Sequence, residues 1–390
     1  MFKRLFCADI MDHRLEKPII IVDAAKAFPA EDLPGAVLTN EGLSELMAQV
    51  KENLLHSANP RNIEISDVDF PFDRIGIRSR RILDCLFGVY DIAVAASQKI
   101  TLKRNDLDKL KLIIVATITA DKIVPCVAAS VQDALKLPNN VQVFDVRVGC
   151  SGYVSALEIA SRMMQSYEPG SLALVIGADC MSRVADASDR STCVIFGDGG
   201  GAVLLGTADY EQPSLNPSCT YDNPWRIVST ETYTDGSKGE FITISNEGKQ
   251  DQAVYRFVAR DGKIGVEADE LSKMTVFMDG RAVYKDMVRL VPRKIVEHLK
   301  EHSLTVDDID LFLFHQANAR MIEAIGKRLN VPEHKIHNNI ESLGNTTNGC
   351  IPSLLASEIK RNNPQARKAL IVAFGTGYSL SIAYMERLDY

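Results

Sequence analysis

Short apolar runs alternate with amphipathic stretches along most of the chain after residue 80. Apolar runs of this length, bounded by turn-forming residues, predict buried strands, and the stretches between them have the spacing of helices. The predicted strands are residues 110–117, 141–148, 172–178, 194–206, 308–315 and 368–374. Nearer the start, KPIIIVDAA predicts one more strand and residues 41–55 predict a helix. This alternation is typical of a layered α/β protein.

The order of these elements repeats along the chain. LKLIIVATITAD and the helix after it correspond to IDLFLFHQANAR and the helix after that. In the same way GCSGYVSALEIASRM corresponds to GNTTNGCIPSLLASEI. We therefore predict two pseudo-symmetric halves whose helix starts face a shared centre: residues 1–206, including an N-terminal extension, and residues 276–390. Residues 207–275 have weaker periodicity and are predicted to be an insertion of a few strands and surface loops.

Composition and charge exclude several classes of protein. The chain has 390 residues, of which 46% are hydrophobic and 24% charged, so it can bury a large core as an ordinary globular protein does. Its formal net charge of -7 argues against a general electrostatic grip on nucleic acid or anionic membrane. No stretch reaches the roughly 18 consecutive apolar residues of a membrane span. Eight cysteines without a CxxC pair predict a reducing, cytoplasmic compartment.

Cys150 is the strongest candidate for a nucleophile. It follows the predicted strand 141–148 and precedes a helix with one apolar stripe, so it lies at a helix start. The unpaired N–H groups and the dipole at such a position favour the thiolate. Gly149 and Gly152 permit a tight turn and the close approach of a substrate. A lone cysteine is more often a buried structural residue, but the flanking glycines and the repeat favour the catalytic interpretation.

Two further residues converge on the same centre. His315 ends the predicted strand 308–315, and Asn345 lies in LGNTTNG, the repeat equivalent of the turn that holds Cys150. Each alone has an ordinary structural explanation, because an asparagine in a turn often caps a helix and a histidine at a strand end is often structural. Together the three residues supply a nucleophile and two hydrogen-bonding groups.

Two other histidines have the spacing of metal ligands. His298 and His302 are separated by one helical turn. The surrounding KIVEHLKEHSL has the pattern of an exposed helical end. We therefore predict no metal site in the chain.

Seven stretches make the chain similar to the thiolase-fold condensing enzymes, and most of all to the 3-ketoacyl-acyl-carrier-protein synthase III family. They are IGIRSRRI, FDVRVGCSGY, VIFGDGGGAVLLG, MDGRAVYK, FHQANARMI, GNTTNGCIPSLLA and AFGTGYS. The resemblance spans residues 74–390, with the predicted insertion only partly covered. It implies an α/β fold of five layers, α-β-α-β-α, a triad of Cys150, His315 and Asn345, and a homodimer.

The resemblance also implies a chemistry. Cys150 takes an acyl group from a thioester of CoA or acyl carrier protein, and backbone N–H groups of Cys150, Thr376 and Gly377 stabilise the oxyanion. A malonyl-type or 3-ketoacyl-type thioester then reacts by decarboxylative Claisen condensation, and His315 and Asn345 stabilise the enolate. No cofactor is expected beyond the thioester substrates.

Docking residues are implied by matching positions. Relatives present positive charge at the positions of Lys285, Arg320, Lys327 and Arg328, where an acidic carrier would dock. A solvated face is the alternative for these four side chains. Phe70 and Arg74 match an aromatic residue and an arginine that lie near the CoA nucleotide in relatives.

The chain also departs from the family pattern. Val124 stands where many relatives place a bulky aromatic residue that closes the acyl pocket of the partner subunit. This difference and the extra length favour a condensing enzyme of specialised metabolism, with a 3-ketoacyl, dialkylresorcinol or cyclohexanedione-type product. The alternatives are a synthase that initiates fatty-acid synthesis, an acyltransferase that works without decarboxylation, and a non-catalytic partner subunit. The last is disfavoured because no member of the triad is missing.

Overall fold

One large sheet dominates the computed structural model, which describes residues 14–55, 75–207, 224–245, 254–269, 274–361, 363 and 365–388. Ten strands hydrogen-bond in the order β14-β13-β15-β16-β8-β1-β7-β6-β4-β5. Those of the first half are β1 (Arg14–Ala27), β4 (Leu110–Ala116), β5 (Gln142–Val146), β6 (Leu172–Cys180) and β7 (Asp198–Thr207). Those of the second are β8 (Trp225–Thr234), β13 (Leu311–Phe314), β14 (Ile336–His337), β15 (Lys368–Gly375) and β16 (Ser379–Arg387).

The two ends of this sheet have the same pairing pattern. From one edge inward β5, β4 and β6 are parallel, and β7 and β1 follow antiparallel. From the other edge β14, β13 and β15 are parallel, and β16 and β8 follow antiparallel. An antiparallel pair, β1 with β8, joins the two halves. The sequence repeat is thereby confirmed as a structural repeat.

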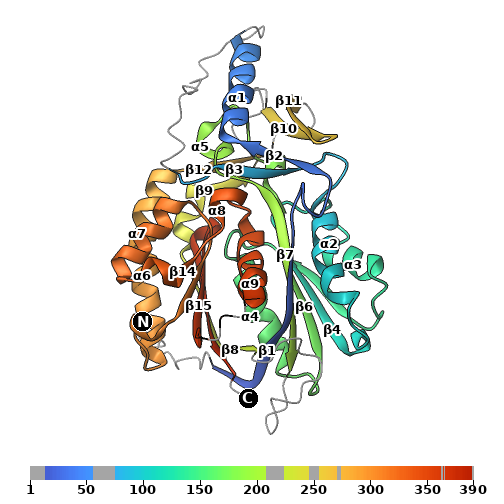
Figure 1. The fold of residues 1–390 in the computed structure, drawn as a ribbon, viewed down its shortest axis with the longest axis vertical. Coiled ribbons are helices and arrows are strands. Elements are labelled where there is room, and N and C mark those ends of the chain that lie inside the picture. Colours follow the sequence, from blue (N-terminus) through green and yellow to red (C-terminus); the bar gives the residue numbers. More distant parts are fainter. Residues whose placement is uncertain are drawn as a thin grey trace, which may run out of the picture.

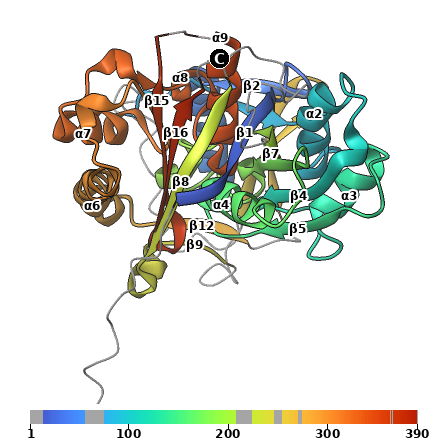
Figure 2. The same cartoon turned by 90° about the horizontal axis from the view of Figure 1, so that it is seen from below.

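Helices complete five layers. The central layer between the two halves of the sheet contains α4 (Gly152–Met164) and α9 (Cys350–Arg361) (Figures 1 and 2). The outer layers contain α2 (Val89–Thr101) and α3 (Val127–Ala134) on one side and α6 (Gly280–Glu301) and α7 (Ala319–Leu329) on the other. Apolar side chains fill the space between each pair of layers, which supplies the main stabilisation. The predicted α-β-α-β-α arrangement is confirmed.

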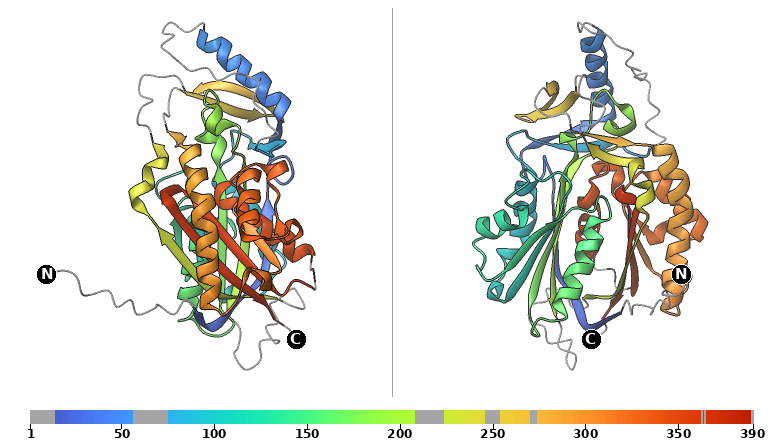
Figure 3. Two further views of the ribbon diagram at one scale, coloured as in Figure 1. Left: turned by 90° about the vertical axis from the view of Figure 1, so that its left-hand side faces the viewer. Right: turned by 180° about the vertical axis from the view of Figure 1, so that it is seen from behind.

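A smaller group of elements covers one end of the layers, at the top of Figure 1. It comprises α1 (Asn40–Leu55), α5 (Arg190–Cys193), α8 (Ile340–Leu343), β2 (Gly35–Thr39), β3 (Ser79–Leu83), β9 (Ile242–Ser245), β10 (Val254–Arg260), β11 (Lys263–Asp269) and β12 (Thr275–Met278). The strands pair as β2 with β3, β9 with β12 and β10 with β11. Viewed from the side and from behind, α1 and the β10–β11 pair project furthest from the sheet (Figure 3).

The region predicted to be an insertion is only partly one. Its first described strand, β8, lies inside the large sheet between β1 and β16 and takes the place in the second half that β1 takes in the first. The pattern concealed this role because Ser229 and Thr230 are fully buried on the strand while Glu231 and Tyr233 are not. A strand with buried hydroxyls lacks the apolar run that identifies a core strand.

Candidate active site

Cys150 occupies a turn that only small neighbours permit. Helix α4 begins two residues later, with Ser151 at its N-cap. A Cβ atom on Gly375 would lie 2.8 Å from the Cys150 sulfur, so the loop after β15 passes the nucleophile without a side chain. Gly149 has a φ of +95°, and a Cβ there would lie 2.5 Å from the Cβ of Thr376. The backbone of the second half therefore closes directly over the nucleophile of the first.

His315 and Asn345 are fixed by backbone hydrogen bonds from neighbouring elements. The His315 N–H donates to the Val372 carbonyl at 2.8 Å, directly after β13. The Asn345 N–H donates to the Ile195 carbonyl at 3.0 Å. Its side-chain Oδ1 accepts the Thr347 N–H at 2.9 Å. Because this bond uses the carbonyl end of the amide, the NH₂ end of Asn345 is the end available as a donor.

The three residues line one cavity of about 260 Å³. Its remaining wall is mostly apolar, which excludes water and strengthens hydrogen bonds made inside. The apolar side chains come from both halves and from the group of elements at the top: Ile75, Ile118, Met181, Val194, Ile195, Phe196, Ile242, Ile244, Val276, Met278, Val283, Ala317, Met321 and Phe374. The structure thus brings Cys150, His315 and Asn345 together around one cavity, as the sequence predicts.

Burial controls the protonation of the site. Only 8% of Cys150 is exposed, and this burial raises the pKa of its thiol to about 11, although hydrogen bonds from Thr376 act in the opposite direction. Burial likewise lowers the pKa of His315 to about 3, and its Nδ1 has no hydrogen-bond partner among the described residues. Burial therefore opposes the expected effect of the helix start on the thiol in the free protein. Near neutral pH the pair is a thiol and a neutral imidazole, and the thiol proton has to pass to the ring together with attack on a substrate because the transfer alone is uphill.

The loop between β15 and β16 supplies the remaining polar groups near the sulfur. Thr376 lines the cavity, and its Oγ1 lies 3.9 Å from the Cys150 Sγ. Gly377 follows with a φ of +71° and is not part of the cavity wall. Because Thr376 lines the cavity and Gly377 does not, the Thr376 N–H is the better candidate to join the Cys150 N–H in the predicted oxyanion hole.

Asp179, at the end of β6, is a buried carboxylate that the sequence analysis missed. Its Oδ1 accepts hydrogen bonds from the hydroxyls and N–H groups of the 117–119 segment at 2.8–3.2 Å. Its Oδ2 accepts one from the Thr347 hydroxyl and two from Asn348, at 2.8 and 3.1 Å. Asp179 thereby holds the turn that carries Asn345. A charged residue that ends an otherwise apolar strand, LALVIGAD, is the signal that would have found it.

The cations predicted to meet a carrier are all exposed on two neighbouring helices, α6 and α7. Both helices begin at the cavity, because Gly280 and Val283 of α6 and Met321 of α7 line it. The predicted side chains are Lys285, Arg320, Lys327 and Arg328. Arg190, a cation that the sequence analysis missed, belongs to the cavity wall itself.

Of the remaining predicted residues, two fall in the part of the chain that the structure does not describe and one is on the surface. Phe70 and Arg74 lie outside the described residues. Val124 is 78% exposed and its neighbour Ile123 is 91% exposed. Neither lines the cavity of its own chain.

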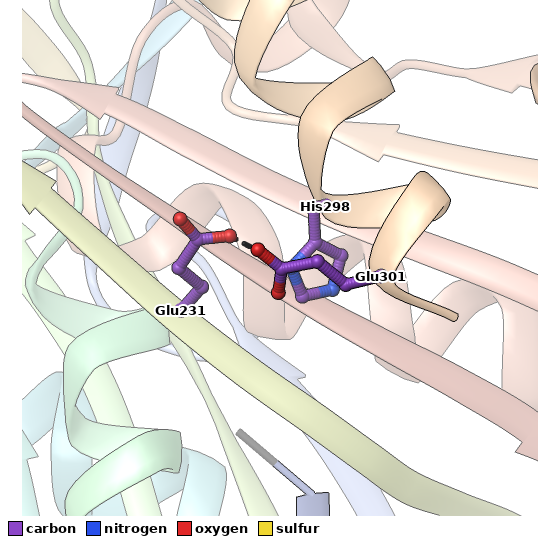
Figure 4. A group of neighbouring side chains, drawn as sticks. All are labelled: Glu231, His298 and Glu301. Carbon is purple, nitrogen blue, oxygen red and sulfur yellow. Dashed lines mark hydrogen bonds and ion pairs between the residues drawn. The ribbon is translucent and has the colours of Figure 1, made fainter. Parts of the chain in front are cut away.

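The sequence pattern predicts that His298 lies on an exposed helical end, but the residue is fully buried on the inner face of α6. Its Nδ1 lies 2.9 Å from a carboxylate oxygen of Glu231, and its Nε2 lies 3.2 Å from the Ser229 hydroxyl. Glu301 completes a group whose oxygen and nitrogen atoms lie within 4.8 Å of one another (Figure 4). Because both ring nitrogens have hydrogen-bond partners, the histidine is satisfied within the fold.

The place of the cavity defines a class of protein. The protein has the thiolase fold of the condensing acyltransferases, and a cysteine at one helix start, an amide at the equivalent turn of the second half and a histidine line one cavity in it. None of the helices in the described ranges is both long and apolar enough to cross a membrane.

Comparison with known proteins gives the family. The family model described as 3-Oxoacyl-[acyl-carrier-protein (ACP)] synthase III matches residues 144–224, and the model of its C-terminal part matches residues 299–387. A beta-ketoacyl-[acyl-carrier-protein] synthase III of Streptococcus uberis is 33% identical over 354 residues, which cover 89% of this chain and 94% of the relative. The chain belongs to the 3-oxoacyl-[acyl-carrier-protein] synthase III family.

Solved structures agree with this assignment. The 3-oxoacyl-[acyl-carrier-protein] synthase III of Aquifex aeolicus matches with a TM-score of 0.72 and 28% identity, covering 94% of this chain and 99% of that one. The priming beta-ketosynthase of the R1128 polyketide pathway matches with a TM-score of 0.71 and 24% identity, covering 97% of each chain. At that identity the second likeness shows the fold alone.

Proposed function

We propose that the protein initiates fatty-acid synthesis by condensing an acyl thioester with a malonyl thioester on acyl carrier protein. The observation that carries this proposal is the cavity shared by Cys150, His315 and Asn345. The relatives are named as acyl-carrier-protein synthases III, which favours this initiating reaction over the specialised product that the sequence led us to expect.

The first half-reaction transfers the acyl group to the cysteine. Neutral His315 takes the proton of the Cys150 thiol, and the sulfur attacks the thioester carbonyl. The N–H groups of Cys150 and Thr376 stabilise the oxyanion of the tetrahedral intermediate. The bond between the carbonyl carbon and the donor sulfur then breaks, and the departing thiolate takes the proton back from His315.

The second half-reaction forms the carbon–carbon bond. The malonyl carboxylate leaves as CO₂, and the electrons of the broken bond form an enolate. The N–H of the neutral His315 ring and the Asn345 amide donate hydrogen bonds to the enolate oxygen. Its carbon attacks the acyl carbonyl, the bond to the Cys150 sulfur breaks, and a 3-ketoacyl thioester leaves. The sulfur leaves as a thiolate and takes a proton from solvent to restore the thiol.

The test is to supply an acyl-CoA and malonyl-acyl carrier protein and to identify the products by mass spectrometry. The expected products are a 3-ketoacyl carrier protein and one CO₂ for each turnover. Formation of acyl-Cys150 with intact malonyl thioester, and passage of the acyl group to an alcohol or amine, would instead establish the acyltransferase without decarboxylation.

We propose that the acidic carrier protein docks on Lys285, Arg320, Lys327 and Arg328. Exposure of all four side chains on helices that begin at the cavity supports this site. Charge reversal of Lys285 and Arg320 is expected to raise KM for carrier-bound malonate several-fold and to weaken its salt dependence, while KM for an acyl-CoA changes little. An equal change in both KM values would assign these residues to the cavity and not to the carrier.

We also propose a homodimer in which Val124 of each chain reaches the acyl cavity of the other. The exposure of Ile123 and Val124 supports this arrangement, as does the position of β5 at an edge of the sheet. Valine leaves more room than phenylalanine, so starter groups longer than acetyl are expected to react faster, by about 0.8 kcal/mol of binding for each buried CH₂. Val124→Phe should shift the preferred starter toward acetyl. An acetyl preference that the substitution does not change, or a monomer by light scattering, would refute the arrangement.

A further inference from the structure

The hydroxyl of Thr376 lies against the nucleophile from the second half of the molecule. Its Oγ1 is 3.9 Å from the Cys150 Sγ, a long contact in which the hydroxyl can donate to the sulfur. Thr376 is part of the cavity wall that also contains the sulfur. The backbone N–H of this residue is already assigned to the oxyanion hole, but the reaction described above gives its side chain no role.

Packing holds this side chain toward the sulfur. The absence of a side chain on Gly149 makes room for it, since a Cβ there would lie 2.5 Å from the Thr376 Cβ and 3.1 Å from its Oγ1. Gly149 directly precedes Cys150 in the chain. The turn that presents the nucleophile is therefore shaped around Thr376.

A pair of buried serines holds the backbone of the same residue. The Ser379 hydroxyl donates to the Thr376 carbonyl at 2.9 Å. The Ser151 hydroxyl lies 2.5 Å from the Ser379 oxygen and must be the donor, because the Ser379 hydrogen is already used. Both serines are almost completely buried. Ser151, which follows Cys150, and Thr376, which lies against its sulfur, are thus joined by hydrogen bonds through Ser379.

The surroundings of the sulfur explain why a hydroxyl is useful here. The cavity wall is mostly apolar, His315 is uncharged near neutral pH, and the Asp179 carboxylate raises the pKa of Cys150 further. A thiolate formed in such a place is stabilised by the imidazolium that the proton transfer creates and by hydrogen-bond donors that point at the sulfur. The Thr376 hydroxyl supplies one, and its hydrogen bond lowers the pKa of the Cys150 thiol.

We propose that Thr376 is a further catalytic residue, whose hydroxyl donates a hydrogen bond to the Cys150 thiolate as the thiol gives its proton to His315. The role rests on the proposed function only in taking Cys150 as the acyl acceptor. Removal of the hydroxyl without the loss of side-chain volume is then expected to leave less thiolate at a given pH. A tenfold loss of thiolate slows reaction at the sulfur by only about threefold, because a more basic thiolate is also a better nucleophile.

The test is the pH profile of Cys150 alkylation by iodoacetamide, followed by mass spectrometry of the peptide. Thr376→Val keeps the shape of the side chain and removes the hydroxyl, and Thr376→Ser keeps the hydroxyl. We expect the valine variant to require higher pH and to react about threefold more slowly near neutral pH. The serine variant should follow the unmodified protein.

Thr346→Val is the matched control. The Thr346 hydroxyl donates to the sulfur of Cys350 at 3.4 Å, in the equivalent turn of the second half. This substitution should leave the alkylation of Cys150 unchanged. Thermal melting checks that each variant is folded, and Thr376→Ala replaces the valine variant if that variant does not fold.

Two results would overturn the proposal. An unchanged pH profile in Thr376→Val would show that the hydroxyl does not act on the sulfur, and equal slowing in the valine and serine variants would show a packing role only. Alkylation needs no thioester, so the outcome is independent of condensation. A failed condensation assay with the expected alkylation profiles would refute the proposed function and leave this role in place.

Discussion

The two equivalent turns at the centre of the molecule are both closely packed, but a buried carboxylate accepts hydrogen bonds only from the second. The turn of Cys150 is shaped by close packing, with Gly149 against Thr376 and Gly375 against the sulfur. The turn of Asn345 is held in addition by hydrogen bonds, because Asp179 accepts from Thr347 and Asn348.

This difference matches what each turn does in the proposed reaction. The cysteine must exchange a proton, so a dry environment with few donors sets its reactivity through the pKa. The Asn345 amide must point its NH₂ end at a developing charge, so a buried carboxylate and a backbone N–H fix its orientation. One fold unit, used twice, therefore provides control of protonation in one copy and control of orientation in the other.

The largest effect is expected when the cysteine of the first turn is removed and the result is compared with removal of the cysteine of the second turn. Cys150→Ala should abolish the acyl label that a radioactive acyl-CoA leaves on the protein, because no other cysteine of the described residues lines the cavity. Cys350→Ala, in the equivalent turn, is the control and should keep the label. An acyl label that persists in Cys150→Ala would remove the asymmetry between the two turns.

Asn345→Ala should separate the two half-reactions. Acylation of Cys150 should continue, while condensation should fall by about 100-fold, as when one oxyanion donor is removed. Rapid quenching and mass spectrometry of the acyl-enzyme measure both steps. Equal losses in both steps would show that the amide serves the cysteine as well.

The pH dependence should differ between the two turns. The pKa of Cys150 is about 11, so alkylation of the free protein should rise about tenfold for each pH unit through the neutral range, with no plateau there. The pKa of His315 is about 3, so the ring stays neutral and condensation by enzyme acylated beforehand should change little over the same range. Alkylation that reaches its plateau near neutral pH would indicate a preformed thiolate–imidazolium pair.

Asp179→Asn should loosen the second turn with the smallest effect on the first. The NH₂ group of the new amide would face N–H and O–H donors that now point at the carboxylate, and two donors cannot bond to each other. The free energy of unfolding should therefore fall by about 2–4 kcal/mol, and condensation by about tenfold. Alkylation of Cys150 should be unchanged or faster, because a negative charge near the sulfur is lost.

Asp198→Asn is the control for Asp179→Asn. The side chain of this second fully buried aspartate accepts hydrogen bonds from Leu83 and Ser182, and not from Thr347 or Asn348. It should lose stability but keep condensation for each folded molecule. Equal losses of condensation in the two variants would assign Asp179 a purely structural role.

Local patterns in the sequence determined the repeat and the three central residues. Buried strands and amphipathic helices have periods that any short segment displays. Strands β4 and β13 lie within the predicted strands 110–117 and 308–315, and α3 and α7 are the helices predicted after them. A cysteine, a histidine and an asparagine at equivalent ends of such elements could therefore be placed around one centre from the order of elements alone.

Only the tertiary structure decided how these residues are charged and held. The pKa of Cys150 is raised by burial beneath a loop more than two hundred residues away in sequence, an effect that the local helix start does not reveal. The place of β8 in the sheet and the burial of His298 likewise depend on partners distant in the chain. A sequence pattern records which face of an element is apolar, but desolvation and hydrogen-bond partners come from the elements that pack against that face.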